Sequence, residues 1–452
     1  MLWRISKKFN FAAEKIIPDT FVFCILLTFV CMLGSLIVSN FNFSLVISGW
    51  RDGIWSMNSF AFQVILMVVV CSASAKSTQV KKLLIRISEI PKSPLSAMVI
   101  FLVTIYIASF INWAFGTILT AILATYLASK VKGLHFPMMI VGGYMVMVQS
   151  QVITPSISAY ALVATPGHFL EDAIGVIPQN LTAFNPMNLL LFAITTIVLC
   201  SVVIFTRPPK DEIVELDAKY LEKVQGEDVE DEADDEERSL ANSMNKSKLI
   251  MLLFGIFGVA AIIHSVMTKG VLGSLNFNGI IFIFMVLNMF LYNTPRRYYL
   301  AMKQSASASA EILLQFPFYG GIMGMMQSSG LASAIAMWLV NISSADTFYV
   351  FSFWSAALVN IFIPSQGGQW IIQGPILTEA AQTLGAHIPY VLNAFLNGDE
   401  MTNLFNPLWA MPALAIVEMK LKDVWGLMFF LLIFWFIVVT LGLYFLPGLF
   451  PV

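Results

Sequence analysis

The sequence predicts an all-α integral membrane protein built from two inverted repeats, with about nine spans, two re-entrant hairpins and two interrupted helices. Three observations predict this fold. Of the 452 residues, 58% are hydrophobic and only 12% are charged, where soluble domains carry about 25% charged residues. The apolar residues gather in runs of about 20, the length that crosses a bilayer. The order of these runs repeats along the chain when Asn112 is aligned with Asn360.

The charge that remains is concentrated in one segment. Residues 206–247 hold 14 Asp/Glu and 6 Lys/Arg, which predicts an acidic cytoplasmic linker between two apolar halves. The composition excludes a soluble enzyme, a nucleic-acid-binding protein, a disulfide scaffold and a disordered chain. The four cysteines lie inside apolar runs without a metal-binding spacing and are expected to be apolar filler.

The apolar runs give the expected spans in order. The first run follows a basic N-terminal segment and is long enough to cross a bilayer. No small-residue cleavage site follows this run, so we expect a retained span rather than a signal peptide. The expected spans are 19–39, 54–75, 137–163, 186–205, 248–267, 275–292, 310–326, 388–418 and 424–447.

Two further apolar regions, 94–130 and 346–384, are interrupted near the middle. The interruptions read Asn112-Trp113-Ala114-Phe115-Gly116 and Pro364-Ser365-Gln366-Gly367-Gly368-Gln369. Each flanking arm has roughly 13 to 18 residues, which favours a helix pair that enters and leaves on one side over two full crossings. The hairpins are therefore predicted from arm length and tip polarity.

The basic residues predict the orientation. We place the N-terminus inside, let nine spans cross and let both hairpins return to their own side. Only Arg51 and Lys269 of the 25 Lys/Arg then lie outside. This distribution satisfies the positive-inside rule. The sequence therefore predicts a cytoplasmic N-terminus and an extracytoplasmic C-terminus.

The two halves contain the same parts in the same order. In each, two spans and an interfacial helix (77–90 or 328–341) precede the hairpin. The first repeat is 1–205, with hairpin 94–130 and interrupted span 137–163. Residues 248–452 form an extra span and the second, inverted repeat, with hairpin 346–384 and interrupted span 388–418. Inverted repeats with discontinuous helices are typical of secondary transporters that bind substrate near the bilayer midplane.

The four helix breaks are the expected sites of chemistry. A break inside a bilayer leaves backbone N–H and C=O groups unpaired, at a cost of several kcal/mol each unless protein, water or ligand satisfies them. The half-helix after each break offers N–H donors and a positive dipole end to an anion such as a carboxylate. The carbonyls before each break suit Na⁺ or a group that carries a proton.

The hairpin tips supply the predicted substrate site. Their amides offer donors and acceptors, and their glycines let the backbone approach a ligand closely. The predicted substrate-binding residues are Asn112, Trp113 and Gly116 at the first tip, and Asn360, Ser365, Gln366, Gly367, Gly368, Gln369 and Gln373 at the second. A surface loop is the alternative for the second tip, and an interfacial anchor is the alternative for Trp113.

The interrupted spans supply the predicted ion-coupling site. Asp399 and Glu400 are intramembrane carboxylates, which are costly and by default functional candidates. They point about 100° apart on a helix, so only one is expected to face the site. The predicted coupling residues are Asp399, Thr402 and Asn403, with Ser150, Thr154 and Ser156 at the other interruption. A helix cap is the alternative for Asp399, and no cofactor or metal is predicted beyond a coupling Na⁺.

The chain resembles the bacterial short-chain fatty acid transporter family (AtoE-like) over most of its length, and several stretches carry the resemblance. They are 110–116, 164–175, 315–324, Val359-Asn360-Ile361-Phe362-Ile363-Pro364-Ser365-Gln366-Gly367-Gly368-Gln369-Trp370 and Gly398-Asp399-Glu400-Met401-Thr402-Asn403. The resemblance implies the ion-transporter superfamily, whose members are typically homodimeric elevator carriers with paired hairpins. It also implies a bacterial inner membrane and uptake of short-chain monocarboxylates such as butyrate or acetoacetate. The chain departs from the family at 149–155 and at Gln366, where the family has a Gly/Ser-rich stretch and a glycine.

These observations predict a secondary active transporter that takes up short-chain fatty acids or related monocarboxylates with Na⁺ or H⁺. The first alternative is a carrier for other small organic anions such as dicarboxylates, although no Lys or Arg lies near a predicted tip or break to meet a second carboxylate. A remote alternative is an integral membrane enzyme, for which the sequence shows no nucleophile–base or metal motif. The expected partners are the carboxylate substrate and the lipid bilayer, and no nucleic acid.

Overall fold

The structure, a computed structural model, describes residues 2–6, 8, 20–56, 58–154, 157–164, 166–168, 170–217, 221, 239–275, 277–364 and 366–450. These residues form helices joined by turns and loops, with no β-strand among them. The all-α prediction is thereby confirmed for the described part of the chain.

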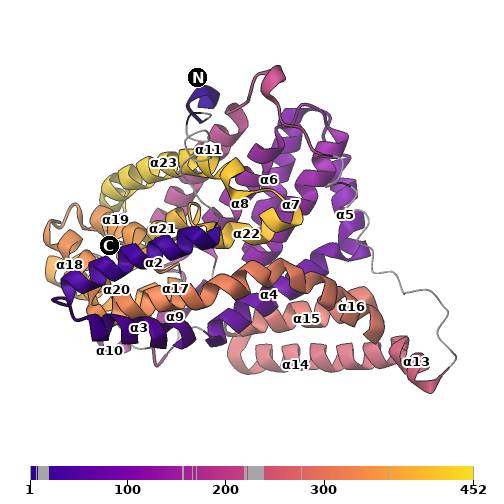
Figure 1. The fold of residues 1–452 in the computed structure, drawn as a ribbon, viewed down its shortest axis with the longest axis horizontal. Helices are drawn as coiled ribbons and strands as arrows, with labels where there is room; N and C mark the ends of the chain where they lie inside the picture. Colours follow the sequence, from indigo (N-terminus) through magenta and orange to yellow (C-terminus); the bar gives the residue numbers. More distant parts are fainter. Residues whose placement is uncertain are drawn as a thin grey trace.

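The helices follow one another along the chain in two halves (Figure 1). The first half contains α2 (Thr20–Val38), α3 (Phe43–Ser56), α4 (Asn58–Lys76), α5 (Thr78–Ser88), α6 (Pro94–Ile111), α7 (Trp113–Lys130), α8 (Phe136–Ser150), the 3-10 turn η1 (Gln151–Ile153), α9 (Ser158–Val163), α10 (Glu171–Ile174) and α11 (Pro186–Phe205). After α13 (Leu240–Asn245) and α14 (Lys248–Ser274), the second half contains α15 (Phe277–Tyr292), α16 (Pro295–Ser305), α17 (Ala310–Ser329), α18 (Leu331–Asn341), α19 (Phe348–Asn360), α20 (Gln366–Leu384), α21 (Ile388–Asn403), α22 (Pro407–Ile416) and α23 (Leu421–Phe445).

All four predicted helix breaks are present. One residue, Asn112, separates α6 from α7, and residues 361–365 separate α19 from α20. The interrupted spans divide into α8 with η1 and α9 in the first half, and into α21 and α22 in the second. The sequence therefore located the helix breaks, while the re-entrant course of the hairpins stays a prediction.

The number of spans differs from the expected nine. Six helical segments are long and apolar enough to cross a membrane, namely 21–38, 94–111, 136–163, 186–205, 248–271 and 425–449. A seventh is reached if α4 and α5, which meet at a bend of 64°, count as one span. Both arms of the first hairpin have 18 residues, whereas in the second α19 has 13 and α20 has 19, so arm length argues against a full crossing only at α19.

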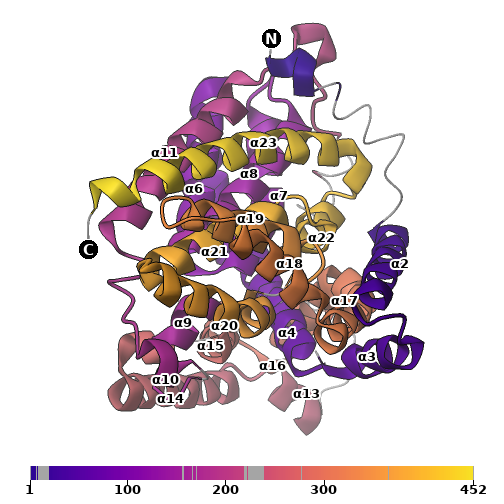
Figure 2. The same ribbon diagram turned by 90° about the vertical axis from the view of Figure 1, so that its left-hand side faces the viewer.

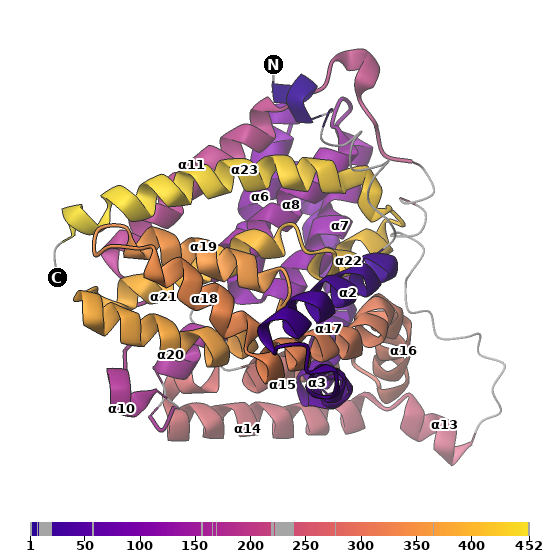
Figure 3. The ribbon, with the colours of Figure 1, turned by 60° about the vertical axis from the view of Figure 1, so that its left-hand side comes forward.

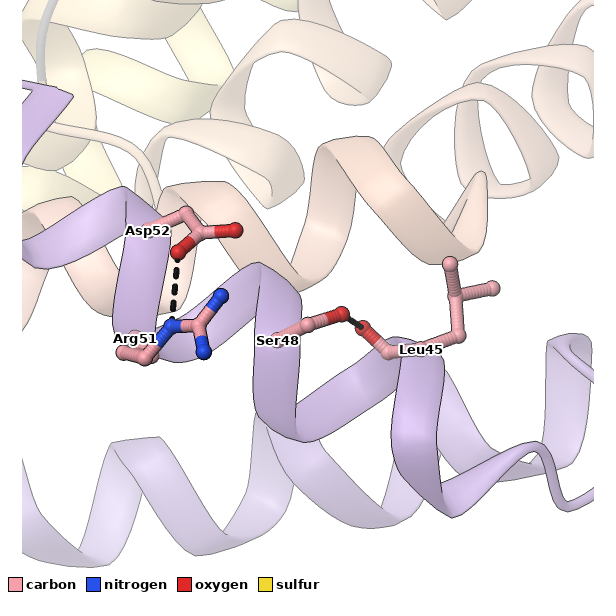
Figure 4. Close-up of polar contacts among 4 residues, drawn as sticks. All are labelled: Leu45, Ser48, Arg51 and Asp52. Atoms are coloured by element: carbon pink, nitrogen blue, oxygen red, sulfur yellow. Dashed lines mark hydrogen bonds and ion pairs between the residues drawn. The ribbon is translucent and has the colours of Figure 1, made fainter.

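Two helices that the sequence analysis missed, α3 and α16, occupy matching places in the two halves. Both are too short and too polar to resemble a span. Helix α3 carries an exposed ion pair, with Arg51 Nε 2.8 Å from Asp52 Oδ1 (Figure 4). Its other face packs against α17, where a Cβ on Gly53 would collide with the backbone oxygen of Gly320. Glycines at this contact let the two helix backbones approach closely.

The helices pack in two groups that meet at the centre. In one group α2 and α3 pack against α17, and α15 and α16 pack against α4. In the other, α6, α7 and α8 pack together, α19 packs against α21, and α23 passes beside α11 and α19 (Figures 2 and 3). The two groups are joined by contacts of α4 with α7. Helix α22 also joins them, because it packs against both α7 and α17.

The start of the acidic linker is docked onto the loop between α7 and α8. The Phe136 N–H donates to the Val214 carbonyl (2.9 Å), and the Val214 N–H donates to His135 Nδ1 (3.1 Å). Burial lowers the pKa of His135 to about 4, so its imidazole is neutral and can accept this bond. Trp3 Nε1 donates to the Glu212 carboxylate (2.6 Å). The described N-terminal residues and the start of the linker therefore lie beside this loop.

Buried amides fasten the two arms of the second hairpin together. Gln369 Nε2 donates to the Ala356 carbonyl (2.8 Å) and to Gln373 Oε1 (2.6 Å), and Gln373 Nε2 donates to Ser355 Oγ (2.8 Å). Both glutamines are fully buried. A buried donor or acceptor that loses its hydrogen-bond partner lowers the stability of the folded protein.

We predict that Gln373→Ala lowers the stability of the protein by about 1–3 kcal/mol, because it leaves the Gln369 and Ser355 side chains without their buried partner. The measurement is the thermal unfolding midpoint of the purified protein in detergent. The matched control is Gln304→Ala, which removes an exposed amide on α16 and should leave the midpoint unchanged. Equal midpoints for the two variants would contradict the fastening role.

Candidate functional site

A cavity of about 90 Å³ lies where the four helix breaks meet. Each break contributes residues to its wall. The lining residues are Val64, Met67, Asn112, Trp113, Met147, Val148, Gln151, Thr154, Ile157, Ser158, Ile280, Pro364, Gln366, Glu400, Asn403 and Trp409. Five predicted site residues are among them: Asn112, Trp113, Thr154, Gln366 and Asn403. Sequence positions almost 300 residues apart are thus brought to one place.

At the first tip, Asn112 ends one helix and begins the next. Its Oδ1 accepts from the N–H groups of Ala114 (2.9 Å) and Phe115 (3.1 Å), which satisfies two donors at the start of α7. Trp113 packs edge to face on Trp409, with 5.2 Å between ring centroids. Its ring therefore contributes to the cavity wall, and the alternative of an interfacial anchor does not fit this position.

Gly116 has a packing role rather than a place in the cavity wall. A Cβ at this position would collide with the Ser109 side chain on the opposite arm. The glycine therefore lets α6 and α7 approach closely. The expectation that Gly116 contacts substrate is not supported by its location.

At the second tip, Gln366 links the hairpin to both interrupted spans. Its Oε1 accepts from the Ala159 N–H at the start of α9 (2.9 Å), and its Nε2 donates to Glu400 Oε1 (3.2 Å). A Cβ on Gly367 would lie 3.4 Å from Ser158 Cβ, so the tip also approaches α9 closely. Gly368 is half-buried, and Ser365 lies outside the described residues.

Asn360 does not behave as an exposed tip residue. Its Nδ2 donates to the Asp399 carbonyl (2.7 Å), Thr402 Oγ1 (3.0 Å) and Asn403 Oδ1 (2.8 Å), and the residue is fully buried. It connects the end of α19 to the end of α21 instead of lining the cavity. Gln369 and Gln373 likewise lie outside the wall, within the hairpin bonds described above.

The two neighbouring carboxylates occupy different positions. Glu400 lines the cavity, whereas Asp399 is fully buried beside it. Asn403 Nδ2 lies 3.1 Å from Asp399 Oδ2 and 3.3 Å from Glu400 Oε2, so that one amide serves both groups. The sequence indicated that only one carboxylate would face the site, and the structure places Glu400 there. The coupling role of Asp399 stays a prediction.

The first interruption contributes polar groups without charge. Thr154 lines the cavity and donates its hydroxyl to the Ser150 carbonyl (2.9 Å). Ser150 lies behind the wall, where its hydroxyl donates to the Met147 carbonyl (2.7 Å). Ser156 lies outside the described residues. Gln151 and Ser158 line the cavity too and were not among the predicted site residues, although both flank the break.

Apart from Trp113, the apolar part of the wall was not predicted. Val64 and Met67 come from α4, Ile280 from α15 and Trp409 from the first turn of α22. Trp409 directly follows the Asn406-Pro407 break, which was an available signal. The other three lie inside ordinary apolar helices, and nothing in their local sequence distinguishes them from lipid-facing or core residues.

The cavity wall combines polar and apolar side chains. Among the described lining residues, Glu400 is the sole charged group, and none is Lys, Arg or His. The helices α7, α20 and α22 begin at the wall with their positive dipole ends. No group of three His, Cys, Asp or Glu that could hold a metal occurs in the described part of the chain. Such a site suits a small molecule with a carboxylate and a short apolar tail.

Comparison with known proteins identifies the family of the chain. A family model described as "Short chain fatty acid transporter" matches residues 1–446. A protein of Escherichia coli (strain K12), named "Putative short-chain fatty acid transporter", is 32% identical over 448 residues, 98% of this chain and 99% of that protein. A protein of Haemophilus influenzae with the same name is 30% identical over 454 residues, 99% of this chain and 100% of that protein.

Among solved structures, the chain is similar to the YdaH transporter of Alcanivorax borkumensis. The alignment covers 96% of this chain and 99% of the other, at 12% sequence identity and a TM-score of 0.45. The family model and the two relatives extend over nearly the full sequence. The chain belongs to the short-chain fatty acid transporter family and is a multi-pass membrane transporter, not an enzyme.

Proposed function

We propose that this protein is a secondary active transporter of a bacterial cytoplasmic membrane that takes up short-chain fatty acids or related monocarboxylates, of the butyrate or acetoacetate class, together with Na⁺ or H⁺. The observation that carries the proposal is the meeting of all four helix breaks at one small cavity. Half-helices that begin at a central site are the means by which secondary transporters hold an anionic substrate.

The size and polarity of the cavity support a short monocarboxylate. A volume of about 90 Å³ is well below the roughly 300–1,000 Å³ of sites that bind drug-sized molecules. Met67, Ile280 and the Trp113–Trp409 pair form an apolar wall for a short tail. The alternative, a dicarboxylate carrier, would need a cation for the second carboxylate, and the described lining holds none.

We place the coupling ion at the second interruption. Asp399 Oδ1 is fully buried and accepts no hydrogen bond from any residue that the structure describes. A buried carboxylate oxygen without a partner is costly, and a bound cation would satisfy it. Asn360 donates to the Asp399 carbonyl and also to the side chains of Thr402 and Asn403, so these residues lie close together. The other proposed coupling residues, Ser150, Thr154 and Ser156, belong to the opposite interruption.

The proposed orientation has the N-terminus and linker inside and the C-terminus outside. Helices α5 and α16, which carry many of the basic residues, lie at one end of the molecule with α13, whereas α3, α10, α18 and the C-terminus lie at the other (Figure 1). Positive charge gathers on the cytoplasmic side of membrane proteins. A homodimer that moves its hairpins in an elevator cycle is the transport mode implied by the family resemblance.

Purified protein in proteoliposomes should accumulate labelled butyrate when an inward Na⁺ or pH gradient is imposed. Protein-free liposomes are the control, because undissociated acids cross lipid bilayers unaided. Unlabelled acetoacetate should compete with butyrate, and succinate should not. Accumulation no greater than in protein-free liposomes would contradict the transport function, and preference for succinate would favour the dicarboxylate alternative.

Asp399→Asn should abolish gradient-driven accumulation, and Asp399→Glu should retain weak transport at most. The amide keeps the size of the side chain but loses the charge that would hold the ion. A helix cap would behave differently, since Asn caps about as well as Asp. Wild-type accumulation by folded Asp399→Asn protein would therefore exclude the coupling role.

The orientation is testable with single cysteines introduced at exposed positions in a Cys200→Ser background. An impermeant thiol reagent should label Asp346→Cys in intact spheroplasts, because the loop between α18 and α19 is placed outside. It should label Lys210→Cys only after lysis. Equal labelling of both positions in intact spheroplasts would refute the proposed orientation.

A further inference from the structure

We propose that Glu400 binds the substrate in its protonated form and carries one proton with each monocarboxylate. The inference rests on the proposed function and specifies the group that meets the substrate. It begins from a conflict in the cavity. The proposed substrate is an anion, yet the sole charged side chain in the described lining is a carboxylic acid, with no Lys, Arg or His to offset it.

The helix dipoles do not remove this conflict. The positive end of a helix offsets only about half a unit charge, and Asn112 already occupies two N–H donors at the start of α7. Two carboxylates in one small cavity would repel each other strongly. A proton on one of them removes the repulsion and supplies a hydrogen-bond donor. The protein can make binding depend on this proton only through one of its own groups, and Glu400 is the acid that lines the cavity.

The amides around Glu400 hold its carboxyl group at the wall whether or not it is ionised. Gln366 Nε2 donates to Oε1 (3.2 Å) and Asn403 Nδ2 lies 3.3 Å from Oε2. Each oxygen thus has one amide donor, which leaves the remaining lone pair or an O–H for a ligand. A protonated Glu400 can donate this O–H to the substrate carboxylate, a charge-assisted bond of the strong kind.

The titratable groups that face Glu400 bring no positive charge. Asp399, its neighbour on α21, shares the Asn403 amide with it. From α8, Tyr144 donates its hydroxyl to the Asn403 carbonyl (2.6 Å), and from α9, Tyr160 donates to the Val152 carbonyl (3.2 Å). Both phenols are neutral donors that are already engaged. The surroundings therefore favour one neutral acid over a pair of adjacent carboxylates.

The proton balance is simple. Glu400 takes one proton from the side on which the substrate enters, donates its O–H to the substrate carboxylate while the site is occupied, and releases the proton on the other side when the substrate leaves. Binding of the anion and of the proton are then linked, so that each increases the affinity for the other. No covalent bond to carbon changes and no other reactant is needed.

The test is butyrate binding to the detergent-solubilised protein between about pH 6 and pH 8, where the free acid is ionised. In the wild-type protein the dissociation constant should rise with pH, by up to about tenfold per pH unit when one proton is required. In Glu400→Gln it should stay constant, because the amide is a permanent neutral donor. The matched control, Glu379→Gln, changes an exposed carboxylate on α20 and should keep the pH dependence of the wild type.

The outcomes separate this inference from the proposed function. If the wild-type protein binds no butyrate at any pH, the proposed function fails. If it binds butyrate with an affinity that does not change with pH, the function stands and the uptake of a proton by Glu400 on substrate binding is refuted, whether or not the variant folds. Loss of all binding in Glu400→Gln protein with a wild-type unfolding midpoint would also refute the inference, since it would mean that the charge itself is required.

Discussion

The structure depends on one constraint, which is that every backbone group freed by a helix break inside the membrane must find a partner. Side-chain amides meet much of this need. Asn112 accepts from two N–H groups at the start of α7, and Gln366 accepts from the Ala159 N–H at the start of α9. Asn360 donates to the Asp399 carbonyl near the end of α21. These bonds tie the broken ends to one another, so satisfying the breaks also assembles the cavity between them.

One of these amides connects the two halves of the chain. Gln366 belongs to the second hairpin, but its oxygen serves a helix of the first interrupted span. Helices α4 and α15 close the other side of the cavity with Val64, Met67 and Ile280. The hairpins and interrupted spans thus provide the polar wall, and helices of the other packing group provide part of the apolar wall. A shift of one group past the other would change the apolar wall while leaving the amide contacts intact.

Charge gives the site its chemical character. The proposed substrate has one carboxylate, yet the described lining offers acid and amide instead of a base. In the proposed mechanism, recognition relies on helix dipoles, neutral donors and a bound cation or proton, so that binding depends on the coupling ion. A basic residue in the wall would hold the anion without any ion and would weaken that dependence.

The sequence by itself determined the all-helical membrane fold, the position of each helix break, the family and the polar residues near the breaks, because each of these follows from local hydropathy, from breaker residues or from motifs. The tertiary structure decided which of them face the cavity. It placed Glu400 in the wall and Asp399 behind it, turned Gln369 and Gln373 into fasteners of a hairpin, and gave Gly116 a packing role. It also revealed α3 and α16, which are too short and too polar for a span pattern. The direction of a side chain depends on how its helix is rotated against its neighbours, and that rotation is set by contacts between residues far apart in the sequence.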